Sequence, residues 1–264
     1  MDLGLKGKLA VVSGSTAGIG FAIAETLAEE GAKVVVNGRT QARVDAALAK
    51  IRAKSKNADL VGVAADLGTA EGATKLANQV PAADILVNNL GIFEVRPFLE
   101  IPDSEWLRFF EINVLSGVRL TRQYLPGMLK KNWGRVIFIS SESGQQIPAE
   151  MVHYGMTKTA QVAVARGVAE TVAGSGVTVN SILVGPTESE GVGGFLESMA
   201  KQQGATKAQV EKDFFEKGRP SSLLKRFETP EEIAAIVAFV ASTQSNGISG
   251  AAVPADGGVI RSIL

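Results

Sequence analysis

Four side chains in the middle of the sequence could together transfer a proton to or from an alcohol. Tyr154 and Lys158 are four residues apart, so a helix would place both on one face. A phenol has a pKa of about 10, and a neighbouring ammonium lowers that pKa by favouring the phenolate. Ser141 precedes Tyr154 by 13 residues and could donate a hydrogen bond to the reacting oxygen. Asn113 could hold a water molecule that relays the proton.

A glycine-rich turn near the N-terminus has the spacing of a phosphate-binding turn. Residues 13–20 read Ser-Gly-Ser-Thr-Ala-Gly-Ile-Gly, directly after an apolar run and before an amphipathic stretch. The first glycine can make a sharp turn, and the later two let backbone N–H groups and a helix N-terminus approach a pyrophosphate. An ordinary strand-to-helix turn is the alternative interpretation. The expected dinucleotide contacts are Gly14, Ser15, Thr16, Gly18, Ile19 and Gly20.

The residues after the second apolar run should choose between NAD and NADP. The position 18 residues past Gly20, where an acid would bind the ribose hydroxyls, holds Gly38, and Arg39 follows it. A carboxylate would repel a 2′-phosphate, whereas arginine can hold it through paired, charge-assisted hydrogen bonds. A solvated arginine at a strand end is the other interpretation. We expect NADP(H) as the cofactor, with NAD(H) as the alternative.

Three further turns follow apolar runs and should lie on the same edge of a parallel sheet, where open α/β sheets bind ligands. The first could accept a hydrogen bond from the adenine amino group, the second could lie beside the ribose, and the third could meet the carboxamide. The residues concerned are Asp66, Leu67, Asn88, Gly91, Gly185 and Thr187, and Tyr154 and Lys158 are expected to contact the cofactor as well.

A tyrosine and a lysine at this spacing, taken alone, are usually an ordinary surface pair on a helix. Together with the glycine turn and Ser141, they make the chain resemble the short-chain dehydrogenases/reductases with Gly-x-x-x-Gly-x-Gly and Tyr-x-x-x-Lys motifs, over nearly all of its length. Asp66, Asn113, residues 88–91 and the closing Asp256-Gly257-Gly258 also carry this resemblance.

The resemblance implies a role for each of the four central side chains. Tyr154 would be the general acid or base, and Lys158 would lower its pKa and hold the nicotinamide ribose. Ser141 would orient the carbonyl, and Asn113 would support the proton relay. The cofactor itself would carry the hydride. The implied activity is transfer of a hydride between NADP(H) and a carbonyl or secondary alcohol.

Three positions depart from the pattern of that family. Leu90 stands where an alanine is usual and brings extra bulk near the cofactor. Val184 replaces the usual proline before Gly185, which could loosen that turn, and Ser189 replaces a frequent threonine. We expect these changes to affect the affinity for the cofactor and to leave the reaction class unchanged.

Short β-branched runs alternate with longer helical stretches along the chain. Continuous apolar strands between helices predict a parallel sheet covered on both faces, and right-handed crossovers make it doubly wound. The expected fold is thus a Rossmann-like α/β sheet of about seven strands. The expected strands are 9–13, 33–37, 60–64, 85–88, 135–140, 177–182 and 251–254, and the expected helices are 21–30, 41–53, 71–79, 104–130, 152–173 and 230–242.

Residues 188–228 interrupt this alternation. The segment is polar and helix-prone, and an insertion of that length is more often a lid or a binding segment than a plain connection. No Pro- or Ser-rich linker divides the sequence. We expect one dinucleotide-binding and catalytic domain over residues 1–264, with a substrate-loop insertion at about 188–228.

The composition excludes several kinds of chemistry. The 264 residues include no cysteine, so disulfides, thiolate zinc sites and thiol nucleophiles are excluded, and one histidine, His153, excludes multi-histidine metal sites. We expect no metal, and a pocket-wall or packing role for His153, which one helical step turns about 100° from Tyr154. The 27 basic and 27 acidic residues balance, so nothing favours nucleic acid or membrane as a partner. No targeting segment or long apolar stretch is visible, which predicts a cytoplasmic protein.

The substrate pocket should combine apolar walls with a few polar donors. Its expected walls are Phe93, Ser143, Gln145, Ile147, Val152, Val192 and Phe195. This mixture leaves a 3-oxoacyl compound, a sugar or polyol, and another ketone open as substrates.

Three other functions remain open from the sequence. One is an NAD(H)-dependent sugar or polyol dehydrogenase of the same fold. Another is a dinucleotide-sensing regulator without turnover, which would not need Ser141, Tyr154 and Lys158 together. A scaffolding protein of this fold is the third. The resemblance also implies a homotetramer, or a dimer, formed through the helices near 104–130 and 152–173.

Overall fold

The computed structural model describes residues 1–263. Within α7, the helix Glu190–Gln203, the description leaves out the side chains at positions 190, 191, 195, 198, 199, 202 and 203. Among the described residues, no helix is both long enough and apolar enough to cross a membrane.

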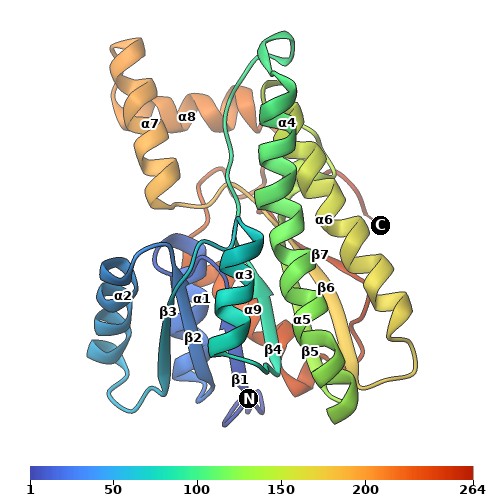
Figure 1. The fold of residues 1–264 in the computed structure, drawn as a ribbon. Coiled ribbons are helices and arrows are strands. Elements are labelled where there is room, and N and C mark those ends of the chain that lie inside the picture. The colour runs from blue at the N-terminus through green and yellow to red at the C-terminus, as the bar shows by residue number, and fades with distance from the viewer. Residues whose placement is uncertain (264) are drawn as a thin grey trace.

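Seven strands in the described part of the chain form one parallel sheet, in the order β3-β2-β1-β4-β5-β6-β7 (Figure 1). The expected doubly wound sheet is therefore confirmed. The order reverses between β1 and β4, which is the place where ligands bind in such sheets. The strands are β1 (Leu9–Val12), β2 (Lys33–Gly38), β3 (Leu60–Ala64), β4 (Ile85–Asn88), β5 (Gly134–Ser141), β6 (Val177–Val184) and β7 (Ala252–Ala255).

The apolar strands bury side chains on both faces of the sheet. Along β2, Val34 and Val36 belong to one core cluster, and Val35 between them belongs to the other. Successive side chains of a strand point to opposite faces, so an unbroken apolar run serves two cores at once. This requirement explains why the strands read as continuous valine, isoleucine and leucine.

Helices cover each face of the sheet (Figure 1). The cluster that contains Val34 also includes Ile23 and Ile233, from α1 and α9, and the opposite cluster includes Leu76 and Leu120, from α3 and α5. Besides α7, the α-helices of the described residues are α1 (Gly18–Glu29), α2 (Gln41–Lys54), α3 (Ala70–Gln79), α4 (Asp103–Phe110), α5 (Ser116–Lys131), α6 (Val152–Thr171), α8 (Lys207–Asp213) and α9 (Pro230–Ala241).

The long helix expected at 104–130 contains a π-helical turn. α4 ends at Phe110, the π-helix η2 runs from Glu111 to Leu115, and α5 begins at Ser116. A π-turn inserts an extra residue into the helical course and often marks a functional position. Here it carries Asn113, which is fully buried.

Helix starts differ in a way that matters for the cofactor. Ala17 precedes α1 and makes no side-chain hydrogen bond, so the first N–H groups of α1 receive no side-chain cap. Hydroxyl side chains instead cap five of the other described α-helices, at Thr40, Thr69, Ser189, Thr206 and Thr229.

The insertion, residues 188–228, is closed at its base by a parallel bridge between Thr187 and Glu228. It contains α7, α8 and the π-helix η5 (Phe214–Gly218), which stand above the sheet in Figure 1. Its small core consists of Leu196, Val210, Phe215 and Phe227. The insertion thus has its own apolar packing, fixed to the end of β6.

The backbone N–H and carbonyl of Glu228 both form hydrogen bonds where the insertion joins the sheet. Its N–H donates to Pro186 O at 2.8 Å, and its carbonyl accepts from Glu188 N at 2.8 Å. Its side chain is 7% exposed, and Oε2 has no hydrogen-bond partner among the described residues. Burial, helped by the nearby Asp256 carboxylate, raises the pKa of Glu228 to about 7.

We expect Gly72→Ala to lower the free energy of unfolding by about 3 kcal/mol. A Cβ at Gly72, in the first turn of α3, would lie 1.8 Å from Asp66 O, so the turn that carries Asp66 would have to move. Gly167→Ala in α6 is the matched control, because a Cβ there meets no atom within 4 Å and should gain about 0.5–1 kcal/mol. Urea denaturation measures both, and equal effects would contradict the close contact.

We expect Glu228→Gln to stabilise the protein at alkaline pH. The pKa of Glu228 in the folded protein is about 7, above the ordinary value of 4.5. The protonated side chain therefore contributes fully to stability below pH 4.5, and this contribution is lost as the pH rises through the folded pKa. Glutamine avoids that loss, which amounts to at most about 3 kcal/mol. Thermal melting should give a larger gain for the variant at about pH 8 than at about pH 5. An equal gain at both would show that Glu228 is already ionised in the folded protein.

Candidate active site

The glycine turn after β1 forms a cradle of backbone groups. Gly14 and Gly18 have φ angles of 62° and 55°, which side chains with a Cβ rarely adopt. A Cβ at Gly20 would lie 2.4 Å from the Asn89 side-chain nitrogen and 2.5 Å from Gly14 O. The uncapped start of α1 then offers free N–H groups beside this tight turn. A dinucleotide pyrophosphate fits such a cradle, because it needs close backbone approach and N–H donors.

Two asparagines hold the glycine turn in place, namely Asn89, which belongs to the motif at residues 88–91, and Asn37, which was not predicted. Asn89 Nδ2 donates to the carbonyls of Ser13 and Gly14, at 3.0 and 3.1 Å. Asn37 Oδ1 accepts from Gly14 N at 3.0 Å, and its Nδ2 donates to two carbonyls at the end of β3. A polar residue directly after the three buried valines of β2 was the available signal for Asn37.

The Ser15 hydroxyl points into the fold. It is fully buried and donates to Val12 O at 2.7 Å, and Ser15 N donates to Asn37 O at 2.8 Å. Neither group is directed to a ligand. Ser15 therefore shapes the turn, which differs from the phosphate contact expected of it.

The end of β2 has no room for an acid. A Cβ at Gly38 would lie 2.5 Å from Thr16 Cγ2, so a longer side chain would displace the glycine turn. Arg39, the next residue, is exposed. The position that would hold the ribose-binding carboxylate is thus closed, and an exposed arginine follows it in the sequence.

The other expected cofactor residues fall into two groups. Asp66 is exposed, and its Oδ1 accepts a hydrogen bond from Gly68 N at 3.0 Å. Gly91 lies close to Lys158, because a Cβ added at Gly91 would be 3.5 Å from Lys158 Nζ. The side chains of Leu67, Asn88 and Thr187 are buried instead and pack or hydrogen-bond within the fold.

Gly185 explains why the turn after β6 holds its shape without the usual proline. A Cβ there would lie 2.5 Å from Glu228 Oε2 and 2.6 Å from Asp256 Cα. Val184 before it is buried and pairs with Ala255 of β7. The glycine therefore allows three segments to meet at this turn.

The other two departures from the family pattern lie against the glycine turn. Leu90 Cδ1 would be 3.4 Å from a Cβ at Gly14, so its bulk fills space beside the turn. Ser189 caps α7 by accepting from Val192 N at 3.2 Å, and its Cβ would be 3.3 Å from a Cβ at Gly18. The start of the insertion thus contacts the start of α1.

Tyr154 and Lys158 lie one turn apart near the start of α6. Lys158 Nζ is 5.6 Å from the centre of the Tyr154 ring and donates to Ile139 O at 2.9 Å. Burial lowers the pKa of Lys158 to about 8. Burial also raises the pKa of Tyr154, and a hydrogen bond with Ser141 opposes part of that increase. Burial therefore outweighs the groups that lower the pKa of Tyr154, and the effect expected of Lys158 on that pKa stays a prediction.

Asn113 is held entirely by protein groups. Its Oδ1 accepts from Ile92 N at 2.8 Å, and its Nδ2 donates to Ile92 O and Thr157 Oγ1, both at 3.0 Å. Its carbonyl accepts from Gln161 Nε2 at 2.6 Å. The side chain thus fixes the position of the π-turn, and one lone pair each on Oδ1 and on the backbone carbonyl oxygen is left for a relay water.

Ser141 ends β5 and makes an unexpected contact with its neighbour in sequence. Its Oγ donates to Glu142 Oε2 at 2.8 Å and accepts from Ser143 N at 3.1 Å. The other carboxylate oxygen of Glu142 accepts from Arg219 Nε at 2.7 Å. Glu142 and Arg219 were not predicted, because 77 residues separate them and only folding brings them together.

The expected substrate walls are only partly brought together. The Phe93 ring meets Tyr154 edge-on, with centroids 6.4 Å apart, and the exposed Ile147 lies over Gly155. Gln145 is exposed, Val152 is partly buried, and Ser143 is buried with its hydroxyl donating to Glu142. The side chain of Phe195 lies outside the described residues.

A hollow of about 460 Å³ separates the glycine turn from the insertion. Gly18 lines it on one side, and Ser189, Val192 and Leu196 line it on the other. Val192 therefore faces the cofactor turn, whereas Phe93 and Ile147 lie near Tyr154. The hollow therefore places the start of the insertion next to the glycine turn.

His153 packs against aromatic rings. It is fully buried, its ring centroid is 4.1 Å from that of Phe109, and Trp106 meets it edge-on at 6.1 Å. Neither ring nitrogen has a hydrogen-bond partner among the described residues, and burial lowers its pKa. An uncharged imidazole in this apolar setting agrees with the packing role expected from its place on the helix.

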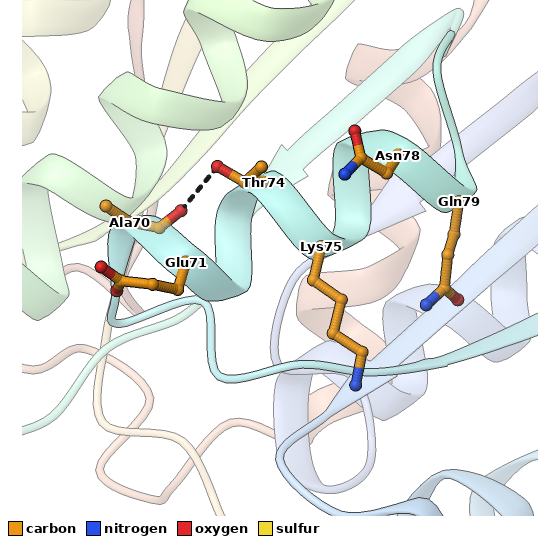
Figure 2. Close-up of a pocket in the computed structure, with 6 residues that line it drawn as sticks. All are labelled: Ala70, Glu71, Thr74, Lys75, Asn78 and Gln79. Atoms are coloured by element: carbon orange, nitrogen blue, oxygen red, sulfur yellow. Dashed lines mark hydrogen bonds between the residues drawn. The ribbon is translucent and has the colours of Figure 1, made fainter.

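A second hollow, of about 480 Å³, lies outside this site (Figure 2). Its lining comes from one face of α3 and includes Glu71, Lys75 and Gln79, whose side chains extend from the helix separately. None of the residues discussed above lines it. It is a surface depression unconnected with the cluster around Tyr154.

Known proteins are similar to this chain along its whole length. Residues 8–200 match the profile of the family described as short chain dehydrogenase. An uncharacterized oxidoreductase of Bacillus subtilis, YvaG, is 48% identical over 264 residues, covering 100% of both chains. D-beta-hydroxybutyrate dehydrogenase of Cupriavidus necator is 34% identical, covering 96% of this chain and 98% of the relative.

A solved structure shares the whole fold. L-Sorbose reductase of Gluconobacter frateurii, crystallised with NADPH and L-sorbose, superimposes with a TM-score of 0.94 at 31% identity, covering 100% of both chains. The glycine cradle, the Tyr-x-x-x-Lys helix and the sheet order occur here together with these similarities. The chain therefore belongs to the short-chain dehydrogenase/reductase family.

Proposed function

We propose that this protein is an NADP(H)-dependent oxidoreductase that interconverts a ketone and a secondary alcohol, with Tyr154 as general acid and base. The arrangement of Tyr154, hydrogen-bonded to Ser141 and followed one turn later by Lys158, carries this proposal. A phenol, a hydroxyl and an ammonium around one point can protonate or deprotonate an oxygen atom. A regulator without turnover would have no use for this cluster.

The cofactor would be held by the glycine cradle and the adjoining turns. Backbone N–H groups at the start of α1 would bind the pyrophosphate, and Arg39 would bind the 2′-phosphate. Asp66 would face the adenine, and Lys158 would bind the nicotinamide ribose. The bound cofactor supplies or accepts the hydride. The NADPH complex of L-sorbose reductase supports this choice of cofactor.

The raised pKa of Tyr154 suits the reduction of a ketone. A phenol that keeps its proton at neutral pH can donate it to the substrate oxygen as negative charge develops there. Lys158, with a pKa of about 8, can hold a proton close to the tyrosine and return it after each turnover. Ser141 can orient the substrate oxygen, provided that its hydroxyl turns away from Glu142.

For the substrate we propose a small ketone of the keto-sugar or 3-oxoacyl type. L-Sorbose in the similar reductase and the hydroxybutyrate named for another relative support these two classes. Phe93, whose ring meets that of Tyr154 edge-on, offers an apolar wall to either. A panel of ketoses and 3-oxoacyl esters would separate the two classes.

We also propose that the chain assembles into a homotetramer. Apolar side chains lie exposed on and next to α4, including Phe98 at 58%, Leu99 at 94% and Leu107 at 71% exposure. A group of exposed apolar side chains is unfavourable in water unless another surface covers it. This surface supports pairing through the helices expected from the resemblance.

We expect Tyr154→Phe to lower kcat by about 10²–10⁴-fold, because it removes the proton donor and leaves the ring. NADPH oxidation over the ketone panel measures the loss, and quenching of NADPH fluorescence should show unchanged cofactor binding. Tyr124→Phe is the matched control, since Tyr124 is the other tyrosine of the chain and donates to Val80 O in the core. A Tyr154→Phe enzyme with more than about a tenth of the wild-type kcat would rule out the role of the phenol.

We expect Arg39→Ala to lower kcat/KM for NADPH by about 10- to 100-fold and to leave kcat/KM for NADH nearly unchanged. The reason is that the guanidinium would contact only the 2′-phosphate. Arg52→Ala, which removes an exposed arginine from the last turn of α2, serves as control. A wild-type enzyme that prefers NADH would contradict the choice of NADP(H) and favour a polyol dehydrogenase.

A further inference from the structure

A buried ion pair lies directly behind the proposed catalytic serine. Glu142, in the short 3-10 helix η3 (Glu142–Gly144), is 3% exposed, and Arg219 is 7% exposed. Arg219 Nε donates to Glu142 Oε1 at 2.7 Å. Desolvating two opposite charges is costly and often gives little net stability. A pair placed at a reacting centre therefore calls for a functional explanation.

Glu142 directs the hydroxyl groups around it. Its Oε2 accepts hydrogen bonds from Ser141 Oγ, at 2.8 Å, and from Ser143 Oγ. A serine hydroxyl has one proton, so Ser141 gives that proton to Glu142 and presents only lone pairs to Tyr154. Ser141 can donate to a substrate oxygen only when this bond to Glu142 is broken or shared.

Arg219 brings the insertion into this network. It directly follows the π-helix η5, and its own N–H donates to Phe214 O at 2.7 Å. Its guanidinium also donates to Gly218 O at 2.9 Å and lies 5.6 Å from the Phe214 ring. Glu150 lies at the outer side of the guanidinium, 3.5 Å away and half exposed. The position of the insertion therefore fixes the position of the guanidinium.

We propose that Glu142 and Arg219 are a positioning pair for the reacting centre, in which Glu142 sets the direction of the Ser141 hydroxyl and Arg219 fixes Glu142 from the insertion. The inference rests on the proposed function, in which Ser141 and Tyr154 act on the substrate oxygen. It makes the substrate-side insertion part of the acid–base apparatus, because the insertion supplies the cation that holds the carboxylate.

The two charges of the pair act on Tyr154 in opposite directions. Glu142 raises the pKa of the phenol and Arg219 lowers it, in both cases through the electric field of the side chain. Lys158 on the same helix lies 5.6 Å from the centre of the ring, and Glu150 faces Arg219 from the rim. Removing one member of the pair should therefore shift the titration of Tyr154, and removing the other should shift it the opposite way.

Three variants test this proposal by the pH dependence of alcohol oxidation. In Glu142→Gln, the pH at which kcat reaches half its maximum should fall, and in Arg219→Met it should rise. Each single variant should change kcat by about 10- to 100-fold, more than it changes KM, because the hydroxyl of Ser141 is no longer held on a fixed carboxylate. The double variant removes both charges, so its pH profile should return toward that of the wild type.

Two neighbouring substitutions are the matched controls. Glu150→Gln removes a carboxylate that touches the same arginine but not Ser141, and Lys217→Met removes an exposed cation two residues before Arg219. Both should leave kcat within about twofold of the wild-type value and the pH profile in place. A shift in either control as large as in Glu142→Gln would show that general surface charge, and not the pair, acts on Tyr154.

A second readout does not need turnover. The chain has only two tyrosines, so the near-ultraviolet absorbance of the phenolate, after subtraction of the Tyr154→Phe curve, reports Tyr154 alone. Opposite shifts of this titration in the two single variants support the proposal even if no substrate has been found. If neither single variant shifts the titration of Tyr154, the proposal is overturned. It is also overturned if the double variant no longer unfolds cooperatively, because the pair would then be purely structural. If the wild-type protein turned over no substrate but the two single variants still shifted the titration in opposite directions, only the proposed function would be contradicted.

Discussion

The pairing of β1 with β4 is the constraint on which the site depends. Val12 pairs with Val87, and Ser13 N continues the ladder by donating to Val87 O at 3.1 Å. Because the chain order reverses between these strands, their loops diverge and leave a crevice at the carboxyl edge of the sheet. The glycine turn fills one side of this crevice, and Asn89, which follows β4, binds that turn from the other. Without this register, neither the cradle nor the approach of Gly91 to Lys158 would form.

The parts of the molecule that could be predicted from the sequence are those fixed by local chemistry. Apolar runs located the seven strands, because a parallel strand buried on both faces tolerates few polar residues. Glycines at positive φ and a tyrosine one helical turn from a lysine leave a signature within a few residues, so Gly14, Gly18, Tyr154 and Lys158 could be named in advance. Family membership followed from the same short motifs, and the relatives confirm it.

The parts that could not be predicted depend on contacts between distant segments. Arg219 reaches Glu142 across 77 residues, and Gln161 reaches Asn113 across 48, so no local pattern records either bond. The π-turn at Asn113 escaped for a related reason, because the sequence there is that of an ordinary helix and the extra residue is set by tertiary contacts. The direction in which a short polar side chain points could not be predicted either. The hydroxyl of Ser15 points inward to a carbonyl that only the folded turn supplies.

Burial shifts the pKa values of Tyr154 and Lys158 in α6 in opposite directions, and this bears on the chemistry that the site can perform. Desolvation disfavours every charge, so it holds Tyr154 as a phenol and brings the pKa of Lys158 down toward neutrality. The protein by itself therefore keeps Tyr154 protonated, as an acid. A phenolate, which alcohol oxidation needs, requires positive charge close to the hydroxyl. Arg219 is a cation that lowers the pKa of Tyr154, and it belongs to the insertion. Because Arg219 belongs to the insertion and donates to Glu142, which accepts from Ser141, the position of the insertion bears on the acid–base role that we propose for Tyr154.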